Sequence, residues 1–350
     1  MARPDGVRAF FTPREHCLVT LVLLWLALAG AAAAILLFSR LLVSSADVIA
    51  DRTGLGRSFV GVIMLATATS LPELVTGVSS ILLVDQPDLA AGDAFGSNLV
   101  NLVIIGIIDL LWRNGPILVA VGRAPIVVGS LGIAVVGCTI VALLAHSGGA
   151  FAESWPVSPV SLMLFLVFLV GMFIIYRQED SPQEESSQGT DDTLSGAFGK
   201  YTVAMLVIVG AAVLLAWTGD RIAHEMGWEA SFVGTQFLAI STSLPEFAAS
   251  YAAVRIGAPD LAIANLLGSN LFNMGFVLVI DDVAYVDGPL WSGIAGIHLL
   301  TAAFAIVMTV VVLAGLLAHK RQKREGRFTW ESLALIVLYA AASVLVFTLA

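Results

Sequence analysis

Two matching stretches decide the fold: "ATSLPELVTG" at Ala68–Gly77 and "STSLPEFAAS" at Ser241–Ser250. Each places a proline directly before a glutamate inside a run that is otherwise apolar. Proline removes a helical N–H and clashes with the carbonyl four residues earlier. An ionised side chain at the centre of a bilayer costs about 2.5–3.5 kcal/mol. A chain that does this twice must compensate both costs elsewhere in its structure.

The composition indicates that lipid is the solvent. The chain is 58% hydrophobic and 12% charged, whereas soluble domains carry about 25% charged residues. Apolar runs predict an all-α polytopic membrane protein with ten transmembrane helices. The predicted spans lie near residues 17–38, 58–81, 88–112, 124–146, 157–176, 201–218, 232–254, 260–280, 290–318 and 330–349.

An internal repeat divides these spans into two sets of five. The segment "ADVIADRTGLGRSFVG" from Ala46 aligns without a gap on "GDRIAHEMGWEASFVG" from Gly219, and both copies continue through "TSLPE". The match resumes as "PDLAAGDAFGSNLVN" against "PDLAIANLLGSNLFN". An odd number of spans per copy predicts two inverted five-helix repeats, a plan typical of secondary transporters. The predicted units are 1–176 (motif about 58–102), an acidic linker at 177–200, and 201–350 (motif about 231–274).

The positive charges predict the orientation. Thirteen of the 17 Lys and Arg residues fall in loops on one face, the face that also receives the linker. Because cytoplasmic loops carry the excess of Lys and Arg, the linker is expected in the cytoplasm and both termini outside. We expect an integral protein of a prokaryotic inner (plasma) membrane.

Polar residues recur at matched depths in the two copies. Glu73 and Glu246 lie midway along the second and seventh spans, and Asp93 in the third span pairs with Asn265 in the eighth. Helix breaks at membrane depth are tolerated only where the freed backbone is satisfied by protein or lines a wet cavity. Freed backbone carbonyls and hydroxyls provide hard, neutral oxygens, and with carboxylate oxygens added the set suits Na⁺ or Ca²⁺. The sequence therefore predicts a midplane cation site, to which hydroxyls beside the two breaks also contribute: Thr69, Ser70, Thr242 and Ser243.

Other repeated polar residues have a structural interpretation. Small residues in membrane helices usually permit close packing, so two motifs are assigned to packing first and to site lining second: Gly96, Ser97 and Asn98, with Gly268, Ser269 and Asn270. A second group is assigned to helix contacts or interfaces: Asn101, Asn273, Asp109 and Asp281.

The paired motifs resemble the cation/Ca²⁺ exchanger superfamily, and most closely its sodium/calcium exchanger branch with alpha-1 and alpha-2 repeats. In each copy "TSLPE" precedes "GSN" by about twenty residues, although Ala68 and Ser241 replace the glycine that usually comes first in that family. The resemblance implies that Glu73 and Glu246 are the central cation ligands. It adds further metal ligands: Thr69, Ser70, Thr242 and Ser243, the carbonyls of Ala66 and Ala239, and the pair Asp93 and Asn265.

The resulting hypothesis is Na⁺/Ca²⁺ exchange by alternating access, with the first and sixth spans sliding against the core that bears the site. Ca²⁺ and Na⁺ (or H⁺) are the expected substrates, bound transiently and without a cofactor, and the lipid bilayer is the surrounding partner. A Ca²⁺/H⁺ antiporter and a cation channel remain alternatives. With 17 Lys and Arg against 26 Asp and Glu, no nucleic-acid partner is expected. No nucleophile–base constellation predicts an enzyme, and protein partners are not predicted.

Overall fold

The computed structural model describes residues 13–53, 69–112, 116–122, 124–149, 157–178, 193–255, 257–318 and 329–350. The described residues form helices and connecting turns, without strands. Seven of these helices are long and apolar enough to cross a membrane by length and composition, and two shorter apolar helices accompany them. The start of the predicted second span and Ala66 lie outside the described residues.

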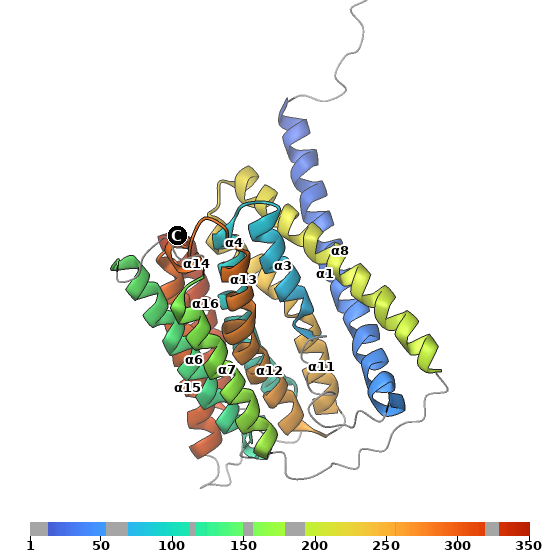
Figure 1. The fold of residues 1–350 in the computed structure, drawn as a ribbon. Coiled ribbons are helices and arrows are strands. Elements are labelled where there is room, and N and C mark those ends of the chain that lie inside the picture. The colour runs from blue at the N-terminus through green and yellow to red at the C-terminus, as the bar shows by residue number, and fades with distance from the viewer. Residues whose placement is uncertain are drawn as a thin grey trace, which may run out of the picture.

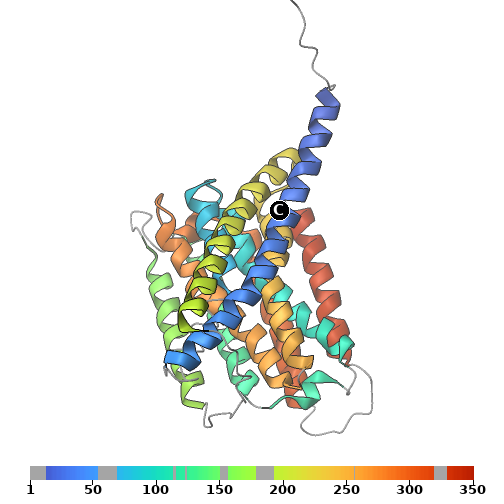
Figure 2. The ribbon, with the colours of Figure 1, turned by 90° about the vertical axis from the view of Figure 1, so that its right-hand side faces the viewer.

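Two long helices stand together at one side of the molecule (Figures 1 and 2). Helix α1 (Pro13–Thr53) has 41 residues and α8 (Leu194–Met226) has 33. At 1.5 Å per residue they are about 60 and 50 Å long, well above the roughly 30 Å of a bilayer core. Both extend beyond the predicted spans, because hydropathy marks the apolar part of a helix and these helices continue through polar residues.

The remaining helices form a bundle around α4 (Pro87–Leu111), which is the most buried of the seven long helices. Helix α4 packs on elements from both halves of the chain, including α3, α12, α15 and α16. The start of α1 and the end of α16 lie at the same end of the bundle (Figure 1). The other elements are α3 (Leu71–Leu82), α5 (Ile117–Ala120), α6 (Ala124–Ser147), α7 (Pro159–Gln178), α9 (Ala230–Val233), η1 (Gly234–Leu238), α10 (Ala239–Thr242), α11 (Leu244–Arg255), α12 (Pro259–Phe272), η2 (Asn273–Val277), α13 (Leu278–Ala284), α14 (Leu290–Gly293), α15 (Ile297–Ala318) and α16 (Trp330–Leu349).

Glycine brings α4 into backbone contact with η1. A Cβ atom added to Gly96 would lie 2.5 Å from the Thr235 carbonyl oxygen, and one on Gly234 would lie 2.5 Å from that of Leu89. These separations are too short for any side chain, so close approach requires glycine at both positions. The packing role predicted for Gly96 agrees with this contact.

Two buried aspartates tie each half of the chain to the other. Asp109 accepts from the backbone N–H of Ile117, eight residues later, and Asp282 does the same with Leu290, also eight residues later. The second oxygen of Asp109 accepts from the N–H of Thr329, which precedes α16. That of Asp282 accepts from the N–H of Ser158, which precedes α7. Each carboxylate therefore holds the start of a helix that belongs to the opposite half.

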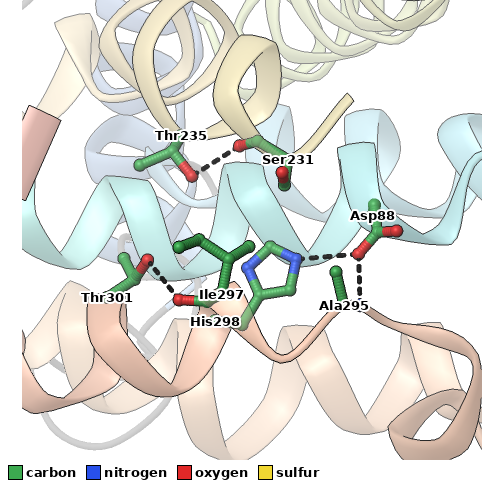
Figure 3. A network of polar contacts seen from close by, with 7 residues as sticks. All are labelled: Asp88, Ser231, Thr235, Ala295, Ile297, His298 and Thr301. Atoms are coloured by element: carbon green, nitrogen blue, oxygen red, sulfur yellow. Dashed lines mark hydrogen bonds and ion pairs between the residues drawn. The ribbon is translucent and has the colours of Figure 1, made fainter. Parts of the chain in front are cut away.

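A second pair of matching hydrogen bonds involves the aspartates of the two "PDL" motifs. Asp88 at the start of α4 accepts from Ala295 N at 2.6 Å, and Asp260 at the start of α12 accepts from Gly122 N at 2.6 Å. Figure 3 shows Asp88 also meeting His298, with a distance of 3.0 Å to Nε2. His298 is buried and stacks on Phe95 of α4. These contacts fix α4 and α12 against the loops of the opposite halves.

The two halves differ by one residue between the asparagine after the "GSN" motif and the aspartate that holds the next loop. The segment from Asn273 to Asp282 is longer by one residue than that from Asn101 to Asp109. The extra residue coincides with the π-helical element η2, and a π-turn is how a helix accommodates such an insertion. As a result Asp282, rather than Asp281, matches Asp109 in its contacts.

Candidate cation-binding site

The two "TSLPE" motifs adopt the same local conformation. Ser70 has φ −95° and ψ 9°, and Ser243 has φ −81° and ψ 3°, so both leave the α-helical region before α3 and α11 begin. In each copy the serine carbonyl then accepts from a backbone N–H four residues later, that of Leu74 or Phe247. The prolines that follow, in the first turn of α3 and of α11, need no helical donor there.

The three predicted carboxylates are buried inside the protein. Glu73, Glu246 and Asp93 are each at most 1% exposed. Glu73 interacts electrostatically with both of the other carboxylates, and Glu246 also interacts with Asp93. The structure therefore places the acidic side chains of α3, α11 and α4 within electrostatic range of one another.

Hydroxyl groups from both halves surround these carboxylates. Thr242 Oγ1 donates to Asp93 Oδ1 at 3.0 Å, and the Thr69 side chain hydrogen-bonds to Glu246. Ser97 Oγ lies 3.4 Å from Thr242 Oγ1, and Ser269 Oγ donates to Glu246 Oε1 at 3.4 Å. The two "GSN" serines thus line the site. The sequence predicted packing as their first role and site lining as their second. Their recurrence in both copies was the sequence feature that pointed to the lining role.

Several oxygens at this site have no hydrogen-bond donor among the described residues. They are Glu73 Oε1 and Oε2, Asp93 Oδ2, Glu246 Oε2, Ser70 Oγ and Ser243 Oγ. Buried polar groups without partners are strongly unfavourable, and buried charges without partners more so. An arrangement of this kind is suited to bind protons or a hard cation, whose preferred ligands are oxygens.

Three further predicted ligands remain predictions, and the structure places two of them. Asn265 is partly exposed and donates its amide to Ser250 Oγ at 3.1 Å, which directs it towards α11 rather than towards Asp93. The Ala239 carbonyl already accepts from Ser243 N at 3.1 Å. Ala66 lies outside the described residues. The hydrogen bond of Asn265 uses its amide nitrogen, so among the described residues its Oδ1 is free to bind a cation.

Asparagines of the "GSN" region lie between the two halves. Asn101 Nδ2 donates to Asn270 Oδ1 at 3.0 Å, and Asn270 donates to the Asn98 carbonyl at 3.2 Å. The side-chain amides of Asn98 and Asn273 are buried and have no hydrogen-bond partner in the described part of the chain. These amides add neutral polar groups on α4 and at the start of η2.

Acidic residues alone do not form a metal centre here. Among the described residues, no three His, Cys, Asp or Glu side chains converge closely enough to hold a metal ion. A cation at this position would therefore need hydroxyl, amide or backbone oxygens besides the carboxylates. Such mixed oxygen coordination is usual for Ca²⁺.

Comparison with known proteins identifies relatives along nearly the whole chain. The family described as "Sodium/calcium exchanger protein" matches twice, at residues 23–174 and 197–348. Inner membrane protein YrbG of Escherichia coli (strain K12) is 26% identical, over 82% of this chain and 86% of its own. Sodium/calcium exchanger MaX1 of Methanosarcina acetivorans is 25% identical, over 87% of this chain and 93% of its own.

Solved structures share the fold. YfkE superposes with a TM-score of 0.62 at 16% identity, covering 95% of this chain and 96% of its own. The sodium-calcium exchanger NCX_Mj superposes with a TM-score of 0.59 at 18% identity, covering 93% and 99%. The apolar helices and the membrane protein relatives make this chain an integral membrane protein. With both halves matched by one exchanger family, the chain belongs to the sodium/calcium exchanger protein family.

Proposed function

We propose that this chain is a secondary active cation antiporter that exchanges Na⁺ for Ca²⁺ by alternating access. The observation that carries the proposal is the burial of Glu73, Glu246 and Asp93, which interact electrostatically and have carboxylate oxygens without a hydrogen-bond partner in the described residues. Three carboxylates neutralise either one Ca²⁺ or up to three Na⁺. Both loads together would place excess positive charge in a medium of low dielectric, where repulsion is strong. Competition for one set of ligands then produces exchange.

The proposed architecture is ten membrane-spanning helices in two inverted five-helix repeats, 1–176 and 201–350, with the linker 177–200 in the cytoplasm and both termini outside. The reciprocal bonds of Asp109 with Thr329 and of Asp282 with Ser158 support a two-fold relation between the halves. The start of α1 and the end of α16 at one end of the bundle agree with an even number of crossings (Figure 1).

Proton coupling is the second candidate. YfkE is described as a Ca²⁺/H⁺ antiporter and NCX_Mj as a sodium-calcium exchanger. This chain has the fold of both, so fold likeness does not distinguish the coupling ions. Glu73, with neither oxygen satisfied by a donor in the described residues, is equally suited to bind a proton in place of Na⁺.

Transport into vesicles separates the two couplings. Purified protein is reconstituted into liposomes, and ⁴⁵Ca²⁺ uptake is followed under an outward Na⁺ gradient and, separately, under a pH gradient. We expect uptake that requires the Na⁺ gradient and stops when the gradient is dissipated. Uptake driven by the pH gradient alone would establish Ca²⁺/H⁺ antiport. Current that follows the Ca²⁺ gradient without any counter-ion would indicate a channel instead.

Neutral variants of the central carboxylates test the site itself. We expect Glu73→Gln and Glu246→Gln each to abolish exchange, because each removes a charged ligand while preserving side-chain shape. Glu225→Gln is the matched control, since Glu225 is exposed on α8. Size-exclusion profiles of all three variants verify folding. Full exchange in both central variants would refute the assignment.

A further inference from the structure

Asp281 on α13 is a buried carboxylate that the central site does not use. Its side chain is 0% exposed, and neither oxygen has a hydrogen-bond partner within the described residues. A Cβ atom added to Gly77 of α3 would lie 2.7 Å from both Asp281 oxygens. The carboxylate therefore packs against the bare backbone of α3, at a point where only glycine leaves room for it.

The neighbouring residue shows that Asp281 is not a structural clamp. Asp282 accepts from Leu290 N at 2.6 Å and from Ser158 N at 2.9 Å, so both of its oxygens are satisfied. The position that corresponds to Asp281 in the first half is Ile108, which precedes Asp109 and is fully buried. The second half thus carries an additional acid where the first half carries an apolar side chain.

The face of α3 next to Asp281 is polar and leads to the central site. Residues three and four apart share one face of a helix, so Gly77 lies on the same face as Glu73 and Ser80, and Thr76 shares that face with Glu73 and Ser80. The hydroxyls of Thr76 and Ser80 are 0% exposed and have no hydrogen-bond partner in the described part of the chain. Glu73 lies one helical turn from Gly77, about 6 Å along the axis.

The charges that act on Asp281 are also acidic. Asp93 of the central site and the adjacent Asp282 both interact electrostatically with it. Like charges raise the cost of an ionised carboxylate that is already out of water. A bound cation would remove this repulsion and provide the missing partner for the carboxylate oxygens.

We propose that Asp281, with the hydroxyls of Thr76 and Ser80, forms a further binding position for a hard cation, Na⁺ or Ca²⁺, one helical turn beyond Glu73 along α3. The inference rests on the proposed antiport function. The neutral oxygens of this binding position come from α3 and its charged carboxylate comes from α13. The position is therefore formed where α3 and α13 pack against each other. It would hold a cation beside the central carboxylates and couple electrostatically to them through Asp93.

Equilibrium binding to purified protein tests this position directly. Bound ⁴⁵Ca²⁺ and ²²Na⁺ per chain are measured for the native protein and for Asp281→Asn. We expect Asp281→Asn to lose one cation per chain, or to weaken the affinity for one class of site about tenfold. Gly77→Ala should act in the same direction, because the added Cβ displaces the carboxylate while keeping its charge. Ser80→Ala should weaken binding less than Asp281→Asn does.

Thermal unfolding separates a binding role from a structural one. Without Na⁺ or Ca²⁺, Asp281→Asn should melt at or above the temperature of the native protein, because a buried charge has been removed. The increase in melting temperature on adding the cation should shrink. The proposal would be overturned if Asp281→Asn and Gly77→Ala both bound cations with native stoichiometry and affinity. It would also be overturned if Asp281→Asn lost proton uptake while its cation binding stayed unchanged. Absence of gradient-driven flux in the native protein would instead refute the antiport function, whatever the binding result.

Discussion

At the scale of single residues, hydrogen-bond partners decide what a buried acid does. Asp109 and Asp282 hold backbone N–H groups at helix starts, whereas Glu73 and Asp281 have carboxylate oxygens that no donor in the described residues satisfies. All four are inside an apolar bundle. The first two stabilise the fold, and we propose that the other two bind ions.

The clamp role predicts a loss of stability. Asp109→Asn and Asp282→Asn each retain one acceptor but place an NH₂ group against backbone donors. We expect each to lower the free energy of unfolding by about 1–3 kcal/mol, measured as a decrease in melting temperature in detergent. Asp220→Asn is the control, because Asp220 forms an i,i+4 pair with the exposed His224, at 3.4 Å, and such pairs contribute about 0–1 kcal/mol. Equal melting temperatures for all three variants would contradict the clamp role.

At the scale of helices, the prolines in the repeated motifs coincide with the places where helices begin. Helices α4 and α12 begin at the prolines of their "PDL" motifs, and α3 begins beside Pro72. The carboxylates beside the breaks, Glu73 and Glu246, are both buried and interact electrostatically. The π-turn η2 escaped prediction because one inserted residue leaves helical periodicity almost unchanged. The direction of Asn265 escaped because its hydrogen bond to Ser250 depends on how α11 and α12 pack.

Packing between α4 and η1 gives an element-scale prediction. We expect Gly96→Ala to destabilise the protein by about 1–3 kcal/mol, the usual cost of overpacking, because the new Cβ would meet the Thr235 carbonyl at 2.5 Å. Gly268→Ala is the matched control. Gly268 occupies the same place in the second "GSN" motif, yet a Cβ there meets nothing within 4 Å.

Melting temperature and exchange rate are both measured to compare Gly96→Ala with Gly268→Ala. Gly96→Ala should lower both, because α4 carries Asp93 and any displacement of the helix moves that carboxylate away from Thr242. Gly268→Ala should leave both near native values. Similar behaviour of the two variants would mean that contact with η1 does not limit the position of α4.

At the scale of the whole molecule, α1 and α8 form a unit distinct from the bundle. The two helices pack chiefly on each other and meet the bundle mainly through α3 and α11, with further contacts to α9, η1, α10 and α4 (Figures 1 and 2). An apolar hollow lies where α8 passes α3, with Ser79 on one side and Val213 on the other. We propose that α8 moves along α3 beside this hollow during alternating access.

Cross-linking tests that movement. In a background with Cys17 and Cys138 replaced by alanine, Ser79→Cys and Val213→Cys are joined across the hollow by a bifunctional methanethiosulfonate. We expect exchange to fall to background and to recover when a reductant releases the bridge, because the link fixes α8 to α3. The control joins Leu42→Cys to Ala204→Cys, two residues in one packed cluster between α1 and α8, and should leave exchange intact. Exchange that persists with the α3–α8 bridge fully formed would show that α8 does not move against the core.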